Sequence, residues 1–391
     1  MKNLVAIGSM IFFLVTGLFI SELISSRSAE NQSLNNQSDD QQTIEDKKVE
    51  SQKATNQPVE NKTDQNQTVG GFSFNCDNTP NKPCQKLVAK HQGKEIEIEP
   101  SGVVWSKIDS KAIIVNDNYN DLVTKNAGHY SIVSFSLKDN SSTIPVTPLL
   151  TPKQGVDYPL YDLEGVTLLG DTIYAIGSLA LHGKNPERDR WERHQFVKMS
   201  LIDSKGELKV KNISHVNEGW KDFRNWLISK SGYSWTGEQT RGKAEGNGIN
   251  VEALTRNTSG NLVLGFRGPL LQNESVLALE LSLPSSKEMT LVQKSVLPQV
   301  KSDKILQDAP KGLRGMAEDP EKPGEYYILV GPKGYEKELI VLARWNSKTG
   351  ELSKVSPLPP GIVGEGVVPI GKNKLLIVDD LKQAILIATE N

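Results

Sequence analysis

The stretch NVEALTRNTSGNLVLGFRGPL, residues 250–270, decides the fold that this sequence predicts. It has a polar start ending at Glu252, an apolar run that opens at Ala253, a turn at 259–261 and a second apolar run at 262–266. Two strand-length runs joined by a glycine-containing turn are typical of a β-hairpin. The stretch therefore predicts a hairpin whose first strand begins with a charged side chain.

Four other stretches repeat this pattern. They are PSGVVWSKIDSKAIIVND (100–117), DLEGVTLLGDTIYAIGS (162–178), LRGMAEDPEKPGEYYILVGP (313–332) and GEGVVPIGKNKLLIVDD (364–380). The five align on one small residue each, namely Gly102, Gly165, Ala253, Gly315 and Gly366, at intervals of 63, 88, 62 and 51 residues. Two more strand-like runs follow each of the first four hairpins, and alternation within 276–281 predicts strands buried mainly on one side. Repeats of four strands at this spacing predict an all-β fold, a β-propeller with five blades.

The last repeat is one strand short, because only residues 384–389 follow its hairpin. An apolar run near the start of the domain, either 86–91 or 94–99, is available to fill the place. Sheets in all-β folds must cover their open edges. We therefore expect an N-terminal strand beside the last blade to close the ring.

The longest interval contains an insertion at 215–249. Within it, residues 219–229 place Trp220, Phe223, Trp226 and Leu227 on one helical face, which predicts a helix packed on the ring. The remainder is rich in glycine and predicts a long loop. If the insertion hides a degenerate blade, the propeller has six blades.

The N-terminal residues predict the domain organisation. Lys2 precedes an uncharged apolar run at 4–21, long enough to cross a bilayer, so residues 1–24 are interpreted as a signal anchor. The charge distribution then places the rest outside the cytoplasm, in the periplasm or at the cell surface. Residues 25–70 are polar and predict a disordered linker, followed by a propeller domain at 71–391. Cleavage of a signal peptide, which would give a secreted protein, is the alternative.

Composition limits the partners and the chemistry. With 45 basic and 47 acidic residues the chain has a net charge of −2 and no basic run, which argues against a nucleic acid partner. Cys76 and Cys84 flank a turn-rich segment and form a local disulfide in an oxidising compartment, or stay as two thiols. Motifs of serine hydrolases, P-loop proteins and dinucleotide-binding enzymes are absent from the sequence.

Candidate site residues come directly before the aligned small residues. They are Ser101, Glu164, Glu252, Arg314 and Glu365, and Arg267 in the second strand of the quoted hairpin is assigned to the same site. Inner strands line the channel of a propeller, so these side chains are expected to meet around one opening. There they could bind a polar ligand, or Glu164, Glu252 and Glu365 could hold a divalent cation such as Ca²⁺. Alternatively, the three glutamates pair with Arg314, Arg267 and Arg256 and lock the blades together.

Two further polar segments have alternative interpretations. The group Asn116 to Asn118 could ligate Ca²⁺, but its spacing favours turn chemistry. In the charged run ERDRWER (187–193), Arg188, Arg190 and Arg193 either form a solvated loop or face an anionic ligand.

The chain resembles the bacterial family of domains of unknown function 3616. The resemblance rests on DLEGVTLLGDTIYAIGS, ERDRWERHQFVKMS, INVEALTRNTSGNLVLGFRGPL, LRGMAEDP and RWN, and extends roughly over 101–386. The chain departs from the family at Ala253, where glycine is usual, and at 179–181, where polar residues are frequent. The resemblance implies a propeller and brings no established activity.

More distantly, a glutamate followed by glycine at the start of an inner strand is similar to gluconolactonase and lactonase propellers. That similarity implies a channel cation on Glu164, Glu252 or Glu365. The sequence thus favours a tethered propeller that binds a small polar ligand or a protein partner at its channel mouth. The alternative is a metal-dependent hydrolase of ester, lactone or phosphoester bonds.

Overall fold

A computed structural model gives the arrangement of most of the predicted propeller. It describes residues 68–69, 72–76, 84–91, 93–96, 98–117, 130–137, 141–150, 160, 162–180, 193–204, 207–216, 223–232, 248–271, 275–283, 289–297, 311–332 and 340–389. The predicted signal anchor and nearly all of the predicted linker lie outside these ranges. Among the helices in the described ranges, none has the length and apolar character needed to span a membrane.

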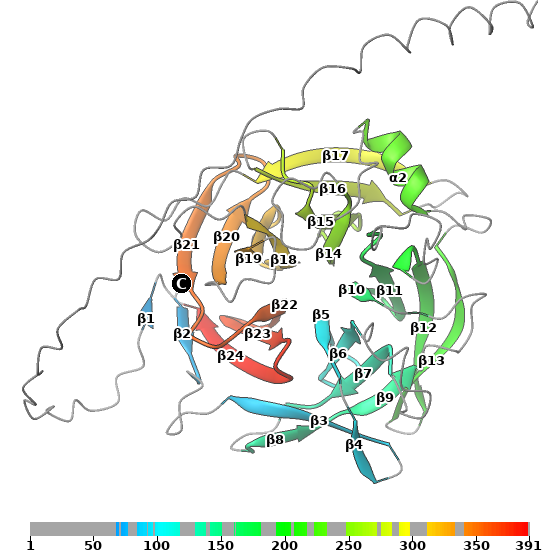
Figure 1. The fold of residues 1–391 in the computed structure, drawn as a ribbon, viewed down its shortest axis with the longest axis vertical. Coiled ribbons are helices and arrows are strands. Elements are labelled where there is room, and N and C mark those ends of the chain that lie inside the picture. Colours follow the sequence, from blue (N-terminus) through cyan, green and yellow to red (C-terminus); the bar gives the residue numbers. More distant parts are fainter. Residues whose placement is uncertain are drawn as a thin grey trace, which may run out of the picture. The chain divides into compact units, whose positions relative to one another are not determined.

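Five sheets stand around a common centre, and each turns one inner strand towards it (Figure 1). The inner strands are β5 (Pro100–Ser106), β10 (Leu163–Leu169), β14 (Asn250–Arg256), β18 (Lys311–Glu318) and β22 (Gly364–Gly371). Each contacts the next around the ring, and β22 contacts β5. The predicted β-propeller is confirmed, with one blade for each repeated hairpin and no sixth sheet among the described residues.

The first four blades are antiparallel sheets of four strands in chain order. Blade 1 continues from β5 with β6 (Lys111–Asn116), β7 (Ile132–Phe135) and β9 (Thr147–Leu150). Blade 2 continues from β10 with β11 (Thr172–Gly177), β12 (Phe196–Ser204) and β13 (Glu207–His215). Blade 3 continues from β14 with β15 (Leu262–Gly268), β16 (Val276–Ser282) and β17 (Thr290–Leu297). Blade 4 continues from β18 with β19 (Glu325–Pro332), β20 (Val341–Asn346) and β21 (Leu352–Pro357).

Blade 5 contains both ends of the described chain. After β22 come β23 (Lys374–Asp379) and β24 (Gln383–Thr389), and the outer place beside β24 is taken by β2 (Phe72–Phe74). Closure of the ring by an N-terminal strand is therefore confirmed. Most of the pairing with β24 comes from β2, which is shorter than either of the runs expected to close the ring, 86–91 and 94–99. Phe72 and Phe74 are buried in one apolar cluster with Ile385 and Ile387, which explains why this short segment is held there.

The two runs that were expected to close the ring have other positions. Strand β3 (Gln85–His91) pairs with only the first two residues of β24, then runs parallel to β8 (Thr143–Pro145). Strand β4 (Lys94–Ile96) pairs with β3 and not with β24. A further short strand, β1 (Thr68–Val69), pairs with β2, so the folded part includes two residues that composition assigned to the linker.

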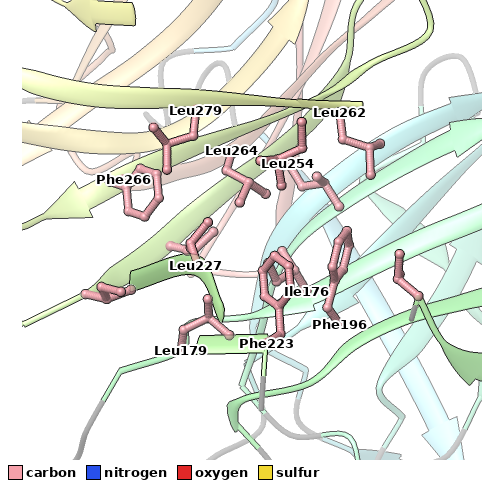
Figure 2. Close-up of a cluster of buried hydrophobic side chains, with 14 of the residues drawn as sticks. Ile176, Leu179, Phe196, Phe223, Leu227, Leu254, Leu262, Leu264, Phe266 and Leu279 are labelled. Atoms are coloured by element: carbon pink, nitrogen blue, oxygen red, sulfur yellow. The ribbon is translucent and has the colours of Figure 1, made fainter. Parts of the chain in front are cut away.

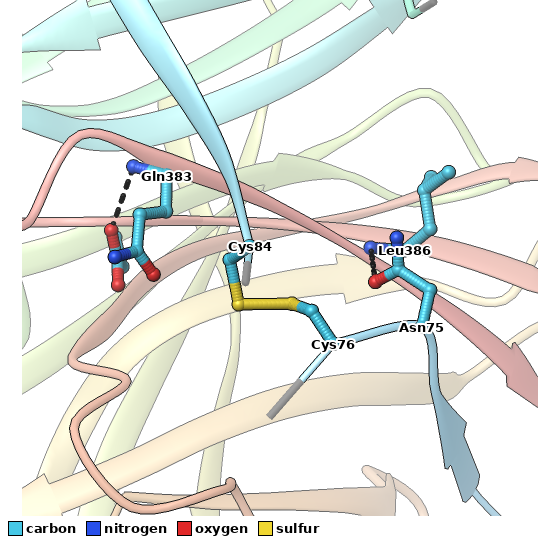
Figure 3. The surroundings of a disulfide bond; sticks show 6 residues. Asn75, Cys76, Cys84, Gln383 and Leu386 are labelled. Carbon is cyan, nitrogen blue, oxygen red and sulfur yellow. Dashed lines mark hydrogen bonds between the residues drawn. A yellow bond between two sulfur atoms is a disulfide. The ribbon is translucent and has the colours of Figure 1, made fainter. Parts of the chain in front are cut away.

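A disulfide joins the two segments that border β24. Cys76 follows β2, Cys84 precedes β3, and the two are bonded (Figure 3). Asn75 fixes the same corner, because its backbone N–H donates to the Leu386 carbonyl at 3.0 Å and its side-chain oxygen accepts from the Leu386 N–H at 2.9 Å. Closing a loop of this length contributes roughly 2.5 kcal/mol by restricting the unfolded chain. The predicted pairing of Cys76 and Cys84 is confirmed.

The blades bury both faces of their sheets. In β16, Leu277 and Leu279 belong to the cluster between blades 2 and 3, whereas Val276 and Ala278 belong to the cluster between blades 3 and 4. The expectation that this strand is buried mainly on one side is therefore wrong. Alternate residues of a strand point to opposite faces, and a blade in a ring has a neighbour on each face.

The predicted helical insertion is present as α2 (Phe223–Ser231). Its Phe223 and Leu227 are buried in the cluster between blades 2 and 3 (Figure 2). The ring of Phe223 lies 4.7 Å from that of Phe196 and 5.4 Å from that of Trp226, measured between centroids. Trp220 lies outside the described residues. The helix thus packs against the outside of the junction between two blades.

Candidate functional site

Every inner strand has a β-bulge at the same place. In β10, Leu163 pairs with Gly177 and Gly165 pairs with Ile176, so Glu164 has no residue opposite it. The corresponding bulge residues of the other blades are Ser101, Glu252, Arg314 and Glu365. A bulge bends its strand and redirects the extra side chain. The position that repeats in the sequence is therefore the bulge of each blade, and we call this end of the inner strands the bulge end.

The small residue after each bulge lies where neighbouring inner strands come closest. A Cβ atom added to Gly165 would lie 2.6 Å from the Cβ of Leu254 and 2.7 Å from its backbone N. A Cβ added to Gly315 would lie 2.7 Å from the carbonyl oxygen of Glu365. These distances are too short for non-bonded atoms, so glycine permits the contact. Alanine at position 253 shows that one methyl group fits in blade 3.

Close packing leaves little space at the bulge end. The cavity there has a volume of about 10 Å³ and is lined by Glu164, Glu252 and Glu365, together with the small residues. This is roughly the space that one water molecule needs. The three glutamates of separate blades therefore line one small space, whereas Ser101, Arg267 and Arg314 are not among its lining residues.

Two of these glutamates have arginine partners. Arg267 Nη1 lies 3.1 Å from Glu252 Oε1, which also accepts a hydrogen bond of 2.6 Å from the side-chain amide of Asn250. Arg314 Nη1 of blade 4 pairs with Glu365 Oε1 of blade 5. Burial, followed by repulsion from Arg267, lowers the pKa of Arg314 to about 10. Arg314 thus stays charged at neutral pH and links two blades.

Part of this polar network lacks partners. Glu365 Oε2 and Asn250 Oδ1 are buried, and neither accepts a hydrogen bond within the described chain. Buried oxygens of this kind are normally satisfied by a donor, a water molecule or an ion. Both oxygens could accept a contact from a bound group.

A third arginine comes from the charged run 187–193. Arg193 Nη2 lies 3.1 Å from Asp162 Oδ1, and the Ser178 hydroxyl donates to Asp162 Oδ2. Asp162 has a positive φ of 55° directly before β10. Arg193 is buried against a carboxylate, so the interpretation of this residue as part of a solvated loop is wrong. Arg188 and Arg190 lie outside the described residues.

Asp162 belongs to a cluster of three carboxylates. Oxygens of Asp117, Asp162 and Glu164 all lie within 4.8 Å of one another. Asp117 directly follows β6 of blade 1, Asp162 directly precedes β10 of blade 2, and Glu164 is the second residue of β10. Glu164 is only 7% exposed and has no hydrogen-bond or ion-pair partner in the described part of the chain. The cluster therefore joins two neighbouring blades around a buried, unpaired carboxylate.

Burial and mutual repulsion make these groups hard to ionise. Burial, then repulsion from Glu252 and Asp117, raises the pKa of Glu164 well above its ordinary value. Burial, then the Asp162 carboxylate, raises the pKa of Asp117 well above its ordinary value. The nearest cations, Arg267 and Arg193, oppose these shifts without cancelling them. The bulge end thus has an excess of carboxyl groups.

The two neighbouring aspartates at the end of β23, Asp379 and Asp380, have different environments. Asp379 is buried and its Oδ1 accepts a hydrogen bond of 2.9 Å from the Gln383 backbone N–H across the turn. Burial raises its pKa to about 7. Asp380 is more exposed. The protein groups around its carboxyl group reduce its hydration and raise its pKa to about 6, and the positive charge of Arg314 opposes this rise. Asp379 is therefore a turn residue, whereas Asp380 borders the charged network.

The structure brings together most, but not all, of the predicted residues. Two of the three ion pairs expected for a locking network are present, but Arg256 lies at the far end of β14, in the wall of another pocket. Asp162 was not in the predicted set, although it precedes Glu164 by two residues at a strand start. Asp117 was assigned to a turn. Only the packing of blade 1 on blade 2 shows that both meet Glu164.

Comparison with known proteins agrees with the resemblance over part of the chain. Residues 239–356 match the model of the family described as "Protein of unknown function (DUF3616)". The DUF3616 match begins before β14, ends within β21 and includes Glu252, Arg267 and Arg314. It is shorter than the expected range of 101–386, and it does not include Glu164 or Glu365. None of the curated proteins matches the sequence.

The solved structures that are similar to this chain belong to different kinds of protein. One is a structural genomics protein of unknown function from Bacteroides thetaiotaomicron (12% identity, 78% of this chain and 75% of that chain, TM-score 0.37). Another is an endo-arabinase from the same organism (12% identity, 76% and 95%, TM-score 0.38). A third is apo AztD from Citrobacter koseri (13% identity, 76% and 66%, TM-score 0.27). None of these likenesses indicates an activity for this chain.

Proposed function

We propose that the bulge end binds a divalent cation, and that the propeller uses it to hold a small polar ligand or a protein partner at that mouth. The observation that carries the proposal is the cluster of Asp117, Asp162 and Glu164, whose oxygens lie within 4.8 Å of one another. Two oxygens bound to the same Ca²⁺ at about 2.4 Å can be at most about 4.8 Å apart. The spread of the cluster therefore fits a hard cation with oxygen ligands.

Charge supports the same conclusion. Asp162, Glu252 and Glu365 each have an arginine, but Glu164 is buried without one. An unpaired buried carboxylate is unfavourable unless it is protonated or meets a cation. A divalent ion would offset this cost, and its remaining coordination positions would be available to a ligand oxygen.

Calcium binding to the full-length chain tests the proposal. Titration calorimetry with CaCl₂ should show saturable binding. Calcium should also raise the midpoint of thermal unfolding, because a hundredfold excess over Kd increases the free energy of unfolding by about 2.7 kcal/mol. Because protons compete for Asp117 and Glu164, whose pKa values are raised, the shift should be larger at pH 8 than at pH 5.

Matched variants locate the site. Glu164→Gln should abolish the calcium-induced shift, whereas Glu321→Gln, which changes an exposed carboxylate far from the cluster, should retain it. Failure of calcium and other divalent ions to bind, or equal behaviour of the two variants, would contradict the proposal.

A hydrolase is the second candidate, and Asp380 is the observation that favours it. A carboxyl group with a pKa of about 6 near Arg314 and Glu252 could act as a general base near neutral pH. A bound cation would polarise an ester, lactone or phosphoester. The full-length protein should then hydrolyse a panel of such substrates in a chelator-sensitive manner, and Asp380→Asn should lose the activity. If the metal-loaded protein hydrolyses none of these substrates, the hydrolase candidate is excluded.

We also propose that the propeller is tethered to a membrane and faces a compartment outside the cytoplasm. Lys2 followed by the apolar run at 4–21 supports the anchor, and the Cys76–Cys84 disulfide supports an oxidising compartment. Fractionation of cells that express the chain should find it in membranes, resistant to alkaline extraction. A full-length protein in the soluble cytoplasmic fraction would contradict the anchor.

A further inference from the structure

The turn end of the inner strands, opposite the bulge end, contains a much larger pocket. There each inner strand turns into the second strand of its blade, and the pocket between these turns has a volume of about 760 Å³. Binding sites for small molecules typically have volumes of about 300–1,000 Å³. All five blades contribute to the lining, so the space is centred on the propeller axis. No residue assigned to the bulge end lines it.

Basic side chains surround this pocket. The lining includes Lys107, Arg256, Lys322, Lys372 and Lys374, from blades 1, 3, 4 and 5. None of the five side chains has a hydrogen-bond or ion-pair partner within the described ranges, so their charges are available to a ligand. Arg256 is half-buried in the wall, and the lysines are exposed around it.

Two of the three acidic side chains that line the pocket have hydrogen-bond or ion-pair partners. Asp319 pairs with Arg344 and accepts a hydrogen bond of 3.1 Å from the Tyr327 hydroxyl. The Glu318 carboxylate accepts a hydrogen bond of 2.9 Å from the Gly324 backbone N–H. Glu321, at the rim, is the exposed carboxylate that remains among the lining residues. Counting Arg344, the lining has six basic side chains and three carboxyl groups, so a ligand would meet an excess of positive charge.

Neutral groups complete the pocket. The half-buried Trp105 forms part of the wall, and Thr167 and Thr255 also line it. Together they offer an apolar surface and further hydrogen-bond donors beside the cations. This combination suits a compact organic anion better than an extended polymer, because the basic groups line a concave space in a chain whose net charge is −2.

We propose that the turn-end pocket binds a small anion that carries phosphate or carboxylate groups. Lysine and arginine side chains would provide charge-assisted hydrogen bonds to its oxygens, and Trp105 would contact its apolar part. This site is separate from the proposed cation site, so either can be present without the other.

Titration calorimetry of the full-length chain, with pyrophosphate and citrate as probes, tests the inference. At least one probe should bind saturably, and added NaCl should weaken the binding, since salt screens exposed charges. Lys372→Glu with Lys374→Glu should reduce the affinity by about tenfold or more, and Arg256→Gln should also reduce it.

The matched control is Lys209→Glu with Lys211→Glu, which makes the same charge change on exposed residues of β13, outside the pocket. It should alter the affinity by less than about twofold. Thermal unfolding of each variant checks folding, and Lys107→Gln provides a second exposed substitution if the charge reversal lowers stability. Absence of saturable binding by both probes, or equal loss in the control, would overturn the inference. So would binding of the wild-type chain to phosphatidylserine vesicles without binding of either probe.

Discussion

At the bulge end the inner strands leave a cavity of about 10 Å³, whereas at the turn end they surround a pocket of about 760 Å³. The small space is lined by glutamates, and the large one by four lysines and Arg256, whose side chains have no partner among the described residues. At the bulge end most of the polar groups are buried, and three of them form ion pairs with arginine, so substitutions there disturb packing or a buried charge. At the turn end they face solvent, so they are available to a ligand at little cost in stability.

Arginine substitutions at the two ends should differ most. Arg314→Met leaves the Glu365 carboxylate buried without its partner, so we expect a loss of about 3–5 kcal/mol in the free energy of unfolding. Arg256→Met, at the turn end, should cost less than about 0.5 kcal/mol, because the Arg256 side chain has no partner among the described residues. Urea denaturation of both variants measures the difference.

The double variant Arg314→Met with Glu365→Leu sharpens this test. It removes both buried charges and should recover most of the lost stability. A loss in the double variant as large as in Arg314→Met would show that shape, and not charge, governs this contact. Similar losses for Arg314→Met and Arg256→Met would remove the distinction between the two ends.

Adding a methyl group should show the next largest difference. In Gly165→Ala the new Cβ meets Leu254 at 2.6 Å, and we expect destabilisation of about 2–3 kcal/mol. In Gly371→Ala, at the turn end of β22, the new Cβ meets no atom within 4 Å and the effect should be close to zero. Thermal unfolding of the pair measures this. If Gly165→Ala is tolerated, the close approach of the inner strands is not required for the ring.

The pH dependence of stability should show the smallest difference. The pKa of Glu164 is raised in the folded state, so its stabilising contribution is complete below the ordinary pKa and is lost as pH rises through the folded pKa. Without divalent ions, Glu164→Gln should therefore become more stable than the wild type as pH rises, by up to about 1 kcal/mol. Glu321→Gln should follow the wild-type curve, and a parallel curve for Glu164→Gln would contradict the raised pKa.

Much of the fold follows from local sequence patterns. Hairpins can be predicted because strand-length apolar runs and their turns lie close together in the chain. The five aligned small residues predict five blades because each blade makes the same close contact. The strand that closes blade 5 was not identified correctly, since Phe72–Phe74 is only three residues long and its stability comes from Ile385 and Ile387 at the other end of the chain.

The candidate site shows the same division. The sequence by itself determined which residue of each blade occupies the bulge, because that residue precedes a small residue in every repeat. Only the tertiary structure decided that Glu252 and Glu365 have arginine partners, that Glu164 meets Asp117 and Asp162 instead, and that Arg256 belongs to the opposite end. Sequence periodicity fixes the position of a side chain along its strand, but its partner depends on how neighbouring blades pack across the ring.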